Sequence, residues 1–276
     1  SKEYFEKTNN TIGYDLLDIC KNGPEEVLTK TKNTQPAIFT LSIVVDSLLK
    51  DNNITPISVA GHSLGEYSAL VSSGVLSFIE ALKLIIIRSS EMEKANNKNN
   101  GSMTAVINAT KEQINVVLEN SNGTLVVANY NTDNQIVISG DKYSINIARH
   151  SFRRLSSRIK CIELNVSGAF HSPLMKFARE ALSNAINLLN FNNANVPIFQ
   201  NINAQPTTEA SEIKKNLILQ LENPVLWSQI INNMIDITNI NYFLECGPAS
   251  VLSGLNQRIS KEINTISVNN LENFNN

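Results

Sequence analysis

The stretch PISVAGHSLGEYSALVSSG, residues 56–74, indicates the fold class, because a buried strand, a tight turn and a helix are predicted in direct succession. Residues Gly61 to Gly65 form a G-x-S-x-G sequence at the turn, which is the setting of a nucleophile elbow. Glycines let the backbone turn without Cβ clashes and lift the serine hydroxyl into a cleft. The stretch therefore predicts an α/β fold with Ser63 as nucleophile, although a chance strand–turn–helix with a capping serine has the same letters.

The helix after the turn predicts an anion site. Its N-terminus points back at Ser63, and the helix dipole favours negative charge there. We therefore expect the backbone N–H of Leu64 to be an oxyanion donor.

A serine nucleophile needs a base, and the chain has only three histidines. His62 directly precedes Ser63, so its side chain is expected to point away. His150 lies in a basic helical run, which is typical of a solvated face. His171 lies in the loop VSGAFHSPLMK, bounded by glycine and proline, and we predict it as the base. The acidic residues before it flank turns, so a backbone carbonyl is the expected partner of its ring.

From residue 101 onward the order of predicted elements changes. The segments SMTAVIN, KEQINVVLENS, GTLVVANYN, NQIVISG, DKYSINIARHSFRRLSSR and IKCIELNV follow in sequence. They give a β-α-β-β-α-β series, which is the order of the ferredoxin-like split βαβ unit. We therefore predict two domains: residues 1–100 and 169–276 form an α/β-hydrolase-like large domain with a parallel sheet, and residues 101–168 form an inserted ferredoxin-like α+β small domain.

Composition excludes several classes of function. The 276 residues carry a net charge of −2, which favours neither nucleic acid nor an anionic membrane as partner. The three cysteines are scattered, so we expect a reduced chain without a disulfide framework or a metal site. No apolar run reaches the roughly 18–20 residues that span a bilayer, and the polar start SKEYFEKTNN predicts no signal peptide.

Composition also bears on location. Asparagine and lysine are heavily used, as in proteins from AT-rich genomes. We expect an intracellular monomer, cytoplasmic or, if the source is a plastid-bearing eukaryote, in the plastid or apicoplast stroma.

Five segments together carry a family resemblance: GHSLGEYSALVSSGVLSFIEALKLIIIRSSEM, VANYNTDNQIVISG, VSGAFHSPLM, ENPVLWSQ and FLECGPASVLSGL. They span almost the whole chain, and it resembles the malonyl-CoA:acyl carrier protein transacylases of the fatty-acid and polyketide acyltransferase superfamily. The resemblance implies a ping-pong transfer without a cofactor. Ser63 would take the malonyl group from malonyl-CoA, and the phosphopantetheine thiol of acyl carrier protein would remove it, with His171 assisting both steps.

The resemblance also implies roles for side chains near the serine. In this family a backbone carbonyl holds the histidine, and the matching position is Gln220. Arg88 matches the arginine that clamps the free carboxylate of malonate, a task that suits the planar guanidinium; otherwise it is an ordinary arginine after an apolar helix face. Met92 and Met103 match pocket-wall positions, although methionine at helical spacing is also usual in a core.

Three further positions match the family. Phe170 resembles the malonyl-selecting variant, because methylmalonyl-selective relatives usually carry serine there. Asn129 and Asn131 match asparagines of the family's cleft, and turn positions are their alternative. Family members also begin with a strand and an F-P-G-Q-G-S-Q motif, whose glutamine supplies a second oxyanion contact. This sequence contains no such stretch, so we expect a sheet strand and one oxyanion donor to be missing from it.

The most basic segment suggests a partner surface. It includes Arg149, Arg153, Arg154 and Arg158, followed by Lys160. We expect these residues to face the cleft between the domains and to bind the acidic carrier protein or the phosphates of CoA, with a solvated helix face as the alternative.

Two other functions stay open from the sequence. One is a trans-acting polyketide acyltransferase or an acyl-hydrolase of carrier proteins. The other is a non-catalytic relative that binds carrier protein without turnover.

Overall fold

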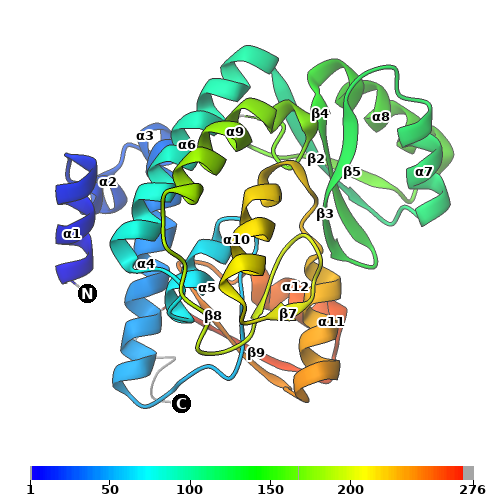
Figure 1. Ribbon diagram of the computed structural model, residues 1–276. Coiled ribbons are helices and arrows are strands. Elements are labelled where there is room, and N and C mark those ends of the chain that lie inside the picture. Colours follow the sequence, from blue (N-terminus) through cyan, green and yellow to red (C-terminus); the bar gives the residue numbers. More distant parts are fainter. Residues whose placement is uncertain (1, 167, 270–276) are drawn as a thin grey trace.

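Helices surround short parallel strands in one part of the molecule, and a four-stranded sheet forms the other part (Figure 1). The computed structural model describes residues 2–166 and 168–269. Ser167 and the last seven positions of the predicted large domain lie outside the described residues. The mixed α/β class predicted from the sequence is confirmed.

Four helices form the first part of the described chain. Their bounds are α1 Lys2–Ile12, α2 Leu16–Asn22, α3 Glu25–Leu28 and α4 Thr31–Asp51. Pro36 lies inside α4 and not in its first turn, where proline is usual, because the helix begins five residues before it. Buried Asn33 fixes the turns of α4 that precede Pro36. It accepts a hydrogen bond from the Tyr14 hydroxyl over 2.6 Å and donates one to the Val27 carbonyl over 2.7 Å. Such tertiary contacts leave no periodic signal.

Two small sheets carry the parallel strands. β1 (Val59–Ala60) pairs in parallel with β6 (Ile198–Phe199), and β7 (Pro206–Thr207) adds to β6 in the antiparallel direction. β8 (Tyr242–Cys246) and β9 (Asn264–Val268) form a separate parallel pair. The predicted parallel pairing is therefore present. Its division into two sheets, and the strand β9, were not predicted.

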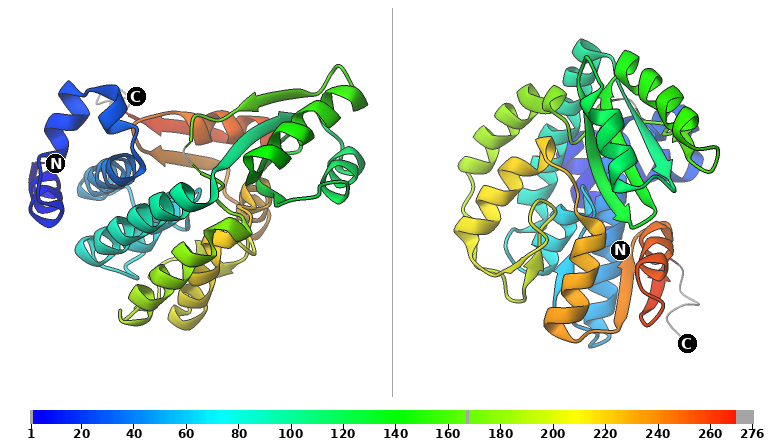
Figure 2. Two further views of the ribbon diagram at one scale, coloured as in Figure 1. Left: turned by 90° about the horizontal axis from the view of Figure 1, so that it is seen from above. Right: turned by 90° about the vertical axis from the view of Figure 1, so that its right-hand side faces the viewer.

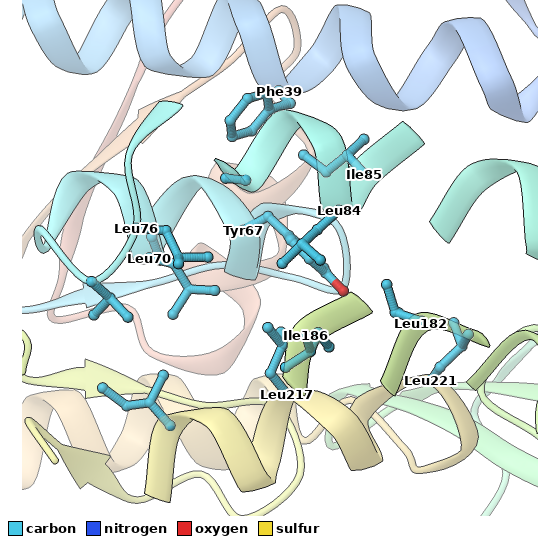
Figure 3. Packing of buried hydrophobic residues seen from close by; sticks show 14 of the residues in the cluster. Phe39, Tyr67, Leu70, Leu76, Leu84, Ile85, Leu182, Ile186, Leu217 and Leu221 are labelled. Carbon is cyan, nitrogen blue, oxygen red and sulfur yellow. The ribbon is translucent and has the colours of Figure 1, made fainter. Parts of the chain in front are cut away.

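The main core lies between two layers of helices. α5 (Gly65–Ser72) and α6 (Phe78–Asn99) pack with α4 on one side. The opposite side is formed by α9 (Lys176–Asn187) and α10 (Ala210–Leu219). Figure 3 shows side chains of both layers meeting, among them Phe39, Leu70, Leu84, Leu182 and Leu217. A capping box of Ser77 with Glu80 begins α6.

The four-stranded sheet has the order β3-β4-β2-β5, with every neighbouring pair antiparallel. Its strands are β2 Gly101–Ile107, β3 Leu125–Thr132, β4 Gln135–Asp141 and β5 Lys160–Glu163. This is the strand order of the predicted ferredoxin-like unit. Two helices, α7 (Lys111–Glu119) and α8 (Lys142–Leu155), cover its outer face (Figure 2). Its inner face carries a second small cluster around Met103 and Ala105.

Two short 3-10 turns and two further helices complete the fold. They are the 3-10 turns η1 (Pro173–Met175) and η2 (Gln220–Glu222) and the helices α11 (Trp227–Thr238) and α12 (Val251–Ile259). Among the helices that the structure describes, none is long and apolar enough to cross a membrane.

Candidate active site

Ser63 sits on a strained turn between β1 and α5. Its φ is +52°, in the left-handed region that non-glycine residues rarely adopt. Gly61 allows the turn, because a Cβ there would lie 2.0 Å from the Gly65 carbonyl carbon. The Leu64 N–H makes no hydrogen bond to any described residue, so it is open to an oxyanion at the start of α5.

His171 meets Ser63 directly. Its Nε2 lies 2.8 Å from Ser63 Oγ, and its Nδ1 lies 3.0 Å from the carbonyl oxygens of both Gln220 and Asn223. Burial, and then the nearby charge of Arg88, lower the pKa of His171 to about 3. The ring is therefore neutral at pH 7. Since Nδ1–H donates to the two carbonyls, the Nε2 lone pair is left to accept the serine hydroxyl proton.

Among the described residues no carboxylate bonds the ring, and carbonyls of η2 and of the residue that follows it are the partners instead. The structure places the predicted Gln220 carbonyl at the ring nitrogen and adds that of Asn223. The second carbonyl was missed, because a backbone acceptor has no signature in the sequence.

Arg88, from the middle of α6, is the third side chain at the serine. Its Nη2 donates to Ser63 Oγ over 2.9 Å, and its Nη1 donates to Gln35 Oε1 over 2.8 Å. The side chain is buried, its Cζ lies 5.6 Å from the centre of the Tyr67 ring, and burial lowers its pKa. No described carboxylate forms an ion pair with it. A buried cation without a counter-ion is costly, and a carboxylate-bearing ligand would supply the missing charge.

Gln35 was not predicted. It is buried on α4, and its Nε2 lies 3.5 Å from Met92 Sδ. The sequence does contain a signal, since Gln35 stands four positions before buried Phe39 on the same helix face. A polar residue on a core face needs a partner, and here the partner is Arg88.

Two more buried polar residues were missed, Glu66 and Asn201. Glu66 lies on the buried face of α5, in line with Ala69 and Leu70. A carboxylate at such a position is unusual, and that signal was available. Asn201 follows β6 without any distinctive pattern.

His62 is bound elsewhere, as expected from its direction. Its Nε2 lies 3.0 Å from Asn131 Oδ1 and 3.5 Å from Asn129 Nδ2, and its ring lies 5.6 Å from that of Trp227. Asn131 also lines a pocket of about 360 Å³ between the inner face of the four-stranded sheet and α12. The structure thus brings both predicted asparagines to the side of the turn.

The predicted pocket-wall residues occupy different places. Met92 is buried beside Gln35, one turn from Arg88 on α6. Met103 lies on β2, in the cluster on the inner face of the four-stranded sheet. Phe170 is half-buried and packs against both that cluster and the main core. Phe170 therefore joins the two packing regions immediately before His171.

The basic run does not face the cleft, and that expectation is wrong. Successive residues of a strand point to opposite faces. Ala105 and Val137 line the pocket, whereas Val106 and Ile138 pack on the outer face against Phe152 of α8. The run is thus carried on the outer side of the sheet. Its charges lie there: Arg149 pairs with Glu163 over 2.8 Å, and Arg153, Arg154 and Arg158 are exposed.

The described residues contain no group of three or more histidine, cysteine, aspartate or glutamate side chains that could hold a metal ion. The groups that meet at the turn are a hydroxyl, a neutral imidazole, a free N–H and a cation. Such a set is suited to acyl transfer through a serine ester. The fold and the site together define a serine-dependent acyl-transferring enzyme.

Comparison with known proteins gives the family. The acyl transferase domain model matches residues 3–271, and the chain belongs to this family. It is 38% identical over 275 residues to a malonyl CoA-acyl carrier protein transacylase of Bacillus subtilis, covering 99% of this chain and 86% of the relative. Identity to the protein of the same name from Haemophilus influenzae is 35% over 277 residues, covering 99% and 88%.

Solved structures give the same result. An acyl carrier protein S-malonyltransferase from Vibrio cholerae superposes with a TM-score of 0.94 at 32% identity, covering 99% of this chain and 90% of that one. A chain in the solved complex of a type II polyketide synthase acyl carrier protein with its malonyl-transacylase matches with a TM-score of 0.94 at 31% identity. The match covers 99% of this chain and 88% of that one.

Proposed function

We propose that this acyltransferase moves the malonyl group of malonyl-CoA to the phosphopantetheine thiol of acyl carrier protein and so supplies fatty-acid synthesis. One observation carries the choice of malonyl. Buried Arg88, without a carboxylate partner, donates directly to the nucleophile Ser63. An acyl group with its own carboxylate one methylene from the reacting carbonyl fits this pair. The relatives named above carry the same activity in their names.

The first step forms an ester. Ser63 Oγ attacks the thioester carbonyl while His171 Nε2 takes the hydroxyl proton, and the Leu64 N–H stabilises the oxyanion. The carbon–sulfur bond then breaks, and the proton passes from His171 to the CoA thiolate. The carbonyls of Gln220 and Asn223 hold the ring in the tautomer and orientation that both transfers need.

The second step reverses the first with another thiol. His171 removes the proton from the phosphopantetheine thiol of acyl carrier protein, and the thiolate attacks the malonyl-serine ester. Ser63 leaves and regains its proton from His171. Because the protein supplies nucleophile, base and anion contacts, we propose that no cofactor is required.

The remaining residues would shape the cleft. We propose that Met92, Met103 and Phe170 bound the acyl pocket, and that Asn129 and Asn131 line the entrance used by the thioester arm. We also propose that residues 1–100 and 169–276 form the catalytic domain and residues 101–168 the small domain that closes over the site. We expect the protein to act as a monomer inside the cell, in the cytoplasm or a plastid stroma, without membrane or nucleic-acid partners.

A trans-acting role in polyketide synthesis is the second candidate. The structure of a type II polyketide carrier protein with its malonyl-transacylase, at a TM-score of 0.94, favours it. Both roles share one reaction and differ only in the carrier protein that accepts the acyl group.

An acyl-adduct experiment tests the proposal. The protein is incubated with malonyl-CoA, acetyl-CoA or methylmalonyl-CoA, and intact mass spectrometry follows adducts on Ser63 with and without carrier protein. We expect a malonyl adduct that persists in buffer and is discharged by carrier protein, and none on Ser63→Ala. Discharge by water alone would indicate a hydrolase, and no adduct at all would indicate a non-catalytic carrier-binding relative. Fatty-acid and polyketide carriers compared at equal concentration separate the two pathways.

A further inference from the structure

The turn that carries Ser63 has backbone groups that belong neither to β1 nor to α5. A buried donor or acceptor without a partner is costly, and the left-handed Ser63 adds strain. Side chains from a distant part of the chain meet this need. Asn201 Oδ1 accepts the Ser63 N–H over 2.7 Å, and Asn201 Nδ2 donates to the Gly61 carbonyl over 2.7 Å. One amide therefore spans the turn on both sides of the nucleophile.

Strand pairing explains why Asn201 reaches this place. β1 and β6 are parallel and in register, with Ala60 opposite Phe199. Both strands end at the same edge, so the residues that follow them lie side by side. Gly61 and Ser63 follow β1, and Asn201 follows β6.

Asn201 is itself fixed by Glu66. Its own N–H donates to Glu66 Oε2 over 2.8 Å, and Glu66 Oε1 accepts from Gln200 Nε2 over 3.1 Å. Glu66 and Asn201 are 1% and 0% exposed, and no described cation pairs with the carboxylate. Burial raises the pKa of Glu66, while the Asn201 N–H, the neighbouring amides and the charge of Arg88 oppose this. Burying a carboxyl group is costly unless it is hydrogen-bonded, and the hydrogen bonds of Glu66 go to Asn201 and Gln200.

Gln220 completes the set from the other side. Its side-chain Nε2 donates to the Ser63 carbonyl over 2.9 Å, while its backbone carbonyl accepts from the His171 ring. The same residue thus holds both partners of the proton transfer.

We infer that Glu66 and Asn201 are positioning residues for Ser63: the Glu66 carboxylate sets the Asn201 amide, which holds the turn so that Oγ stays in line with His171 Nε2. This inference rests on the proposed function of Ser63 as the acylated nucleophile. Both side chains are buried, and Asn201 bonds the backbone of the turn and not the Ser63 hydroxyl. They therefore act on the rate of acylation and leave substrate binding unchanged.

Single-turnover acylation tests the inference. Asn201→Ala removes both contacts, whereas Asn201→Asp keeps the acceptor for Ser63 but sets an oxygen against the Gly61 carbonyl. A small misplacement of a reacting group costs on the order of 10²-fold, so we expect the maximal acylation rate to fall about 10- to 100-fold in both. The half-saturating malonyl-CoA concentration should stay within about twofold, because Arg88 is intact. Acetyl transfer should fall by the same factor as malonyl transfer.

Two further variants separate positioning from loss of structure. Glu66→Gln changes one atom and leaves either the Asn201 N–H or Gln200 Nε2 without an acceptor. We therefore expect a smaller fall in rate with the fold retained, and this variant provides the test if the Asn201 variants do not fold. Asn233→Ala removes an amide that donates to the Ala204 carbonyl over 2.8 Å, away from the turn. It should lower the melting temperature without lowering the acylation rate.

The outcomes are distinct. If the Asn201 and Glu66 variants acylate at the wild-type rate, or lose no more than Asn233→Ala, the positioning role is refuted. A rise in the half-saturating concentration at an unchanged maximal rate would refute it as well. If wild-type Ser63 takes no acyl group, the proposed function itself fails, and this result is recognised before any variant is compared.

Discussion

Arg88 Nη2 donates to Ser63 Oγ over 2.9 Å, so the side chain that we propose for acyl recognition touches the proposed nucleophile. The contact limits the length of the acyl group. In malonate a single methylene separates the carboxylate from the reacting carbonyl, and a longer diacid would place its carbonyl beyond the serine. In the resting protein the same hydrogen bond occupies the serine hydroxyl. A carboxylate that engages the guanidinium replaces this contact while the carbonyl arrives.

Replacing Arg88 with alanine should therefore lower loading from malonyl-CoA but not from acetyl-CoA. Leaving a buried charge unpaired costs about 3–5 kcal/mol, so we expect malonyl loading of Arg88→Ala to fall by roughly 10²–10⁴-fold. Acetyl loading should be spared or improved, since acetate has no carboxylate to clamp. Adduct formation on Ser63 measured with both thioesters checks this. Exposed Arg153→Ala is the control, and equal losses for both acyl groups would contradict the clamp.

The pH dependence of acylation should report the environment of His171. Neutral Nε2 is the active form, and the pKa of the ring is lowered from 6.5 to about 3. As pH falls, the rate is lost only when the ring becomes protonated, so wild-type kcat/KM for acetyl-CoA should show no acidic limb near pH 6.5. Loss of the Arg88 charge raises the pKa of His171, so the limb of Arg88→Ala should move to higher pH, still below 6.5 because burial remains. A limb at the same pH in both proteins would contradict this.

Local patterns were sufficient for much of the fold and for the turn that carries Ser63. The elbow was predictable because a glycine-bounded turn between strand and helix lies within a few residues. His171 followed from eliminating two other histidines, and Arg88 followed from a family resemblance. The small sheet was predictable because its element order has few possible topologies.

What was missed depends on tertiary contacts. Gln35, Asn201 and the Asn223 carbonyl reach the site from segments far apart in sequence, and two of them carry no pattern. The orientation predicted for the basic run was wrong for a related reason. Amphipathicity predicts which face of α8 is exposed, but not which face of the sheet that helix covers.

A change at Gln35 tests how the arginine is oriented. Gln35 Oε1 accepts from Arg88 Nη1 over 2.8 Å. Gln35→Glu would place a carboxylate against the guanidinium and compete with malonate, so we expect KM for malonyl-CoA to rise on the order of 10-fold or more. Acetyl loading should change little. Exposed Gln205→Glu is the matched control, and an unchanged KM for malonyl-CoA would show that Gln35 does not govern the arginine.

A change at Phe170 tests selection between malonyl and methylmalonyl groups. The ring lies directly before His171 and packs against both hydrophobic clusters. Phe170→Ser opens space for an α-methyl branch, and one methyl is worth about 1–3 kcal/mol in a pocket. The ratio of kcat/KM for methylmalonyl-CoA over malonyl-CoA should rise about 10- to 200-fold. Phe177→Ser, at an exposed ring of α9, is the control. A parallel fall for both thioesters would mean that Phe170 only supports packing.

Reversing the charges of α8 tests how the basic run acts on an acidic carrier protein. Because Arg153 and Arg154 lie on the outer face of the sheet, we expect them to act at a distance from the thioester, by attraction across solvent. The screening length is about 10 Å at 0.1 M salt. Arg153→Glu combined with Arg154→Glu should raise KM for carrier protein a few-fold at low salt. Near 0.5 M salt, KM should stay at the wild-type value. Acylation by malonyl-CoA should not change at either salt concentration.

The matched control is the pair Lys30→Glu and Lys32→Glu, which changes the net charge equally at exposed positions near the start of α4. If both pairs raise KM alike, net charge alone attracts the carrier, and the basic run has no special part. A large effect of the α8 pair that persists at high salt would mean direct docking on α8, which contradicts attraction at a distance. An effect of the α8 pair alone that salt removes is the expected result, since exposed charges on one side of a molecule steer an approaching partner without entering the final contact.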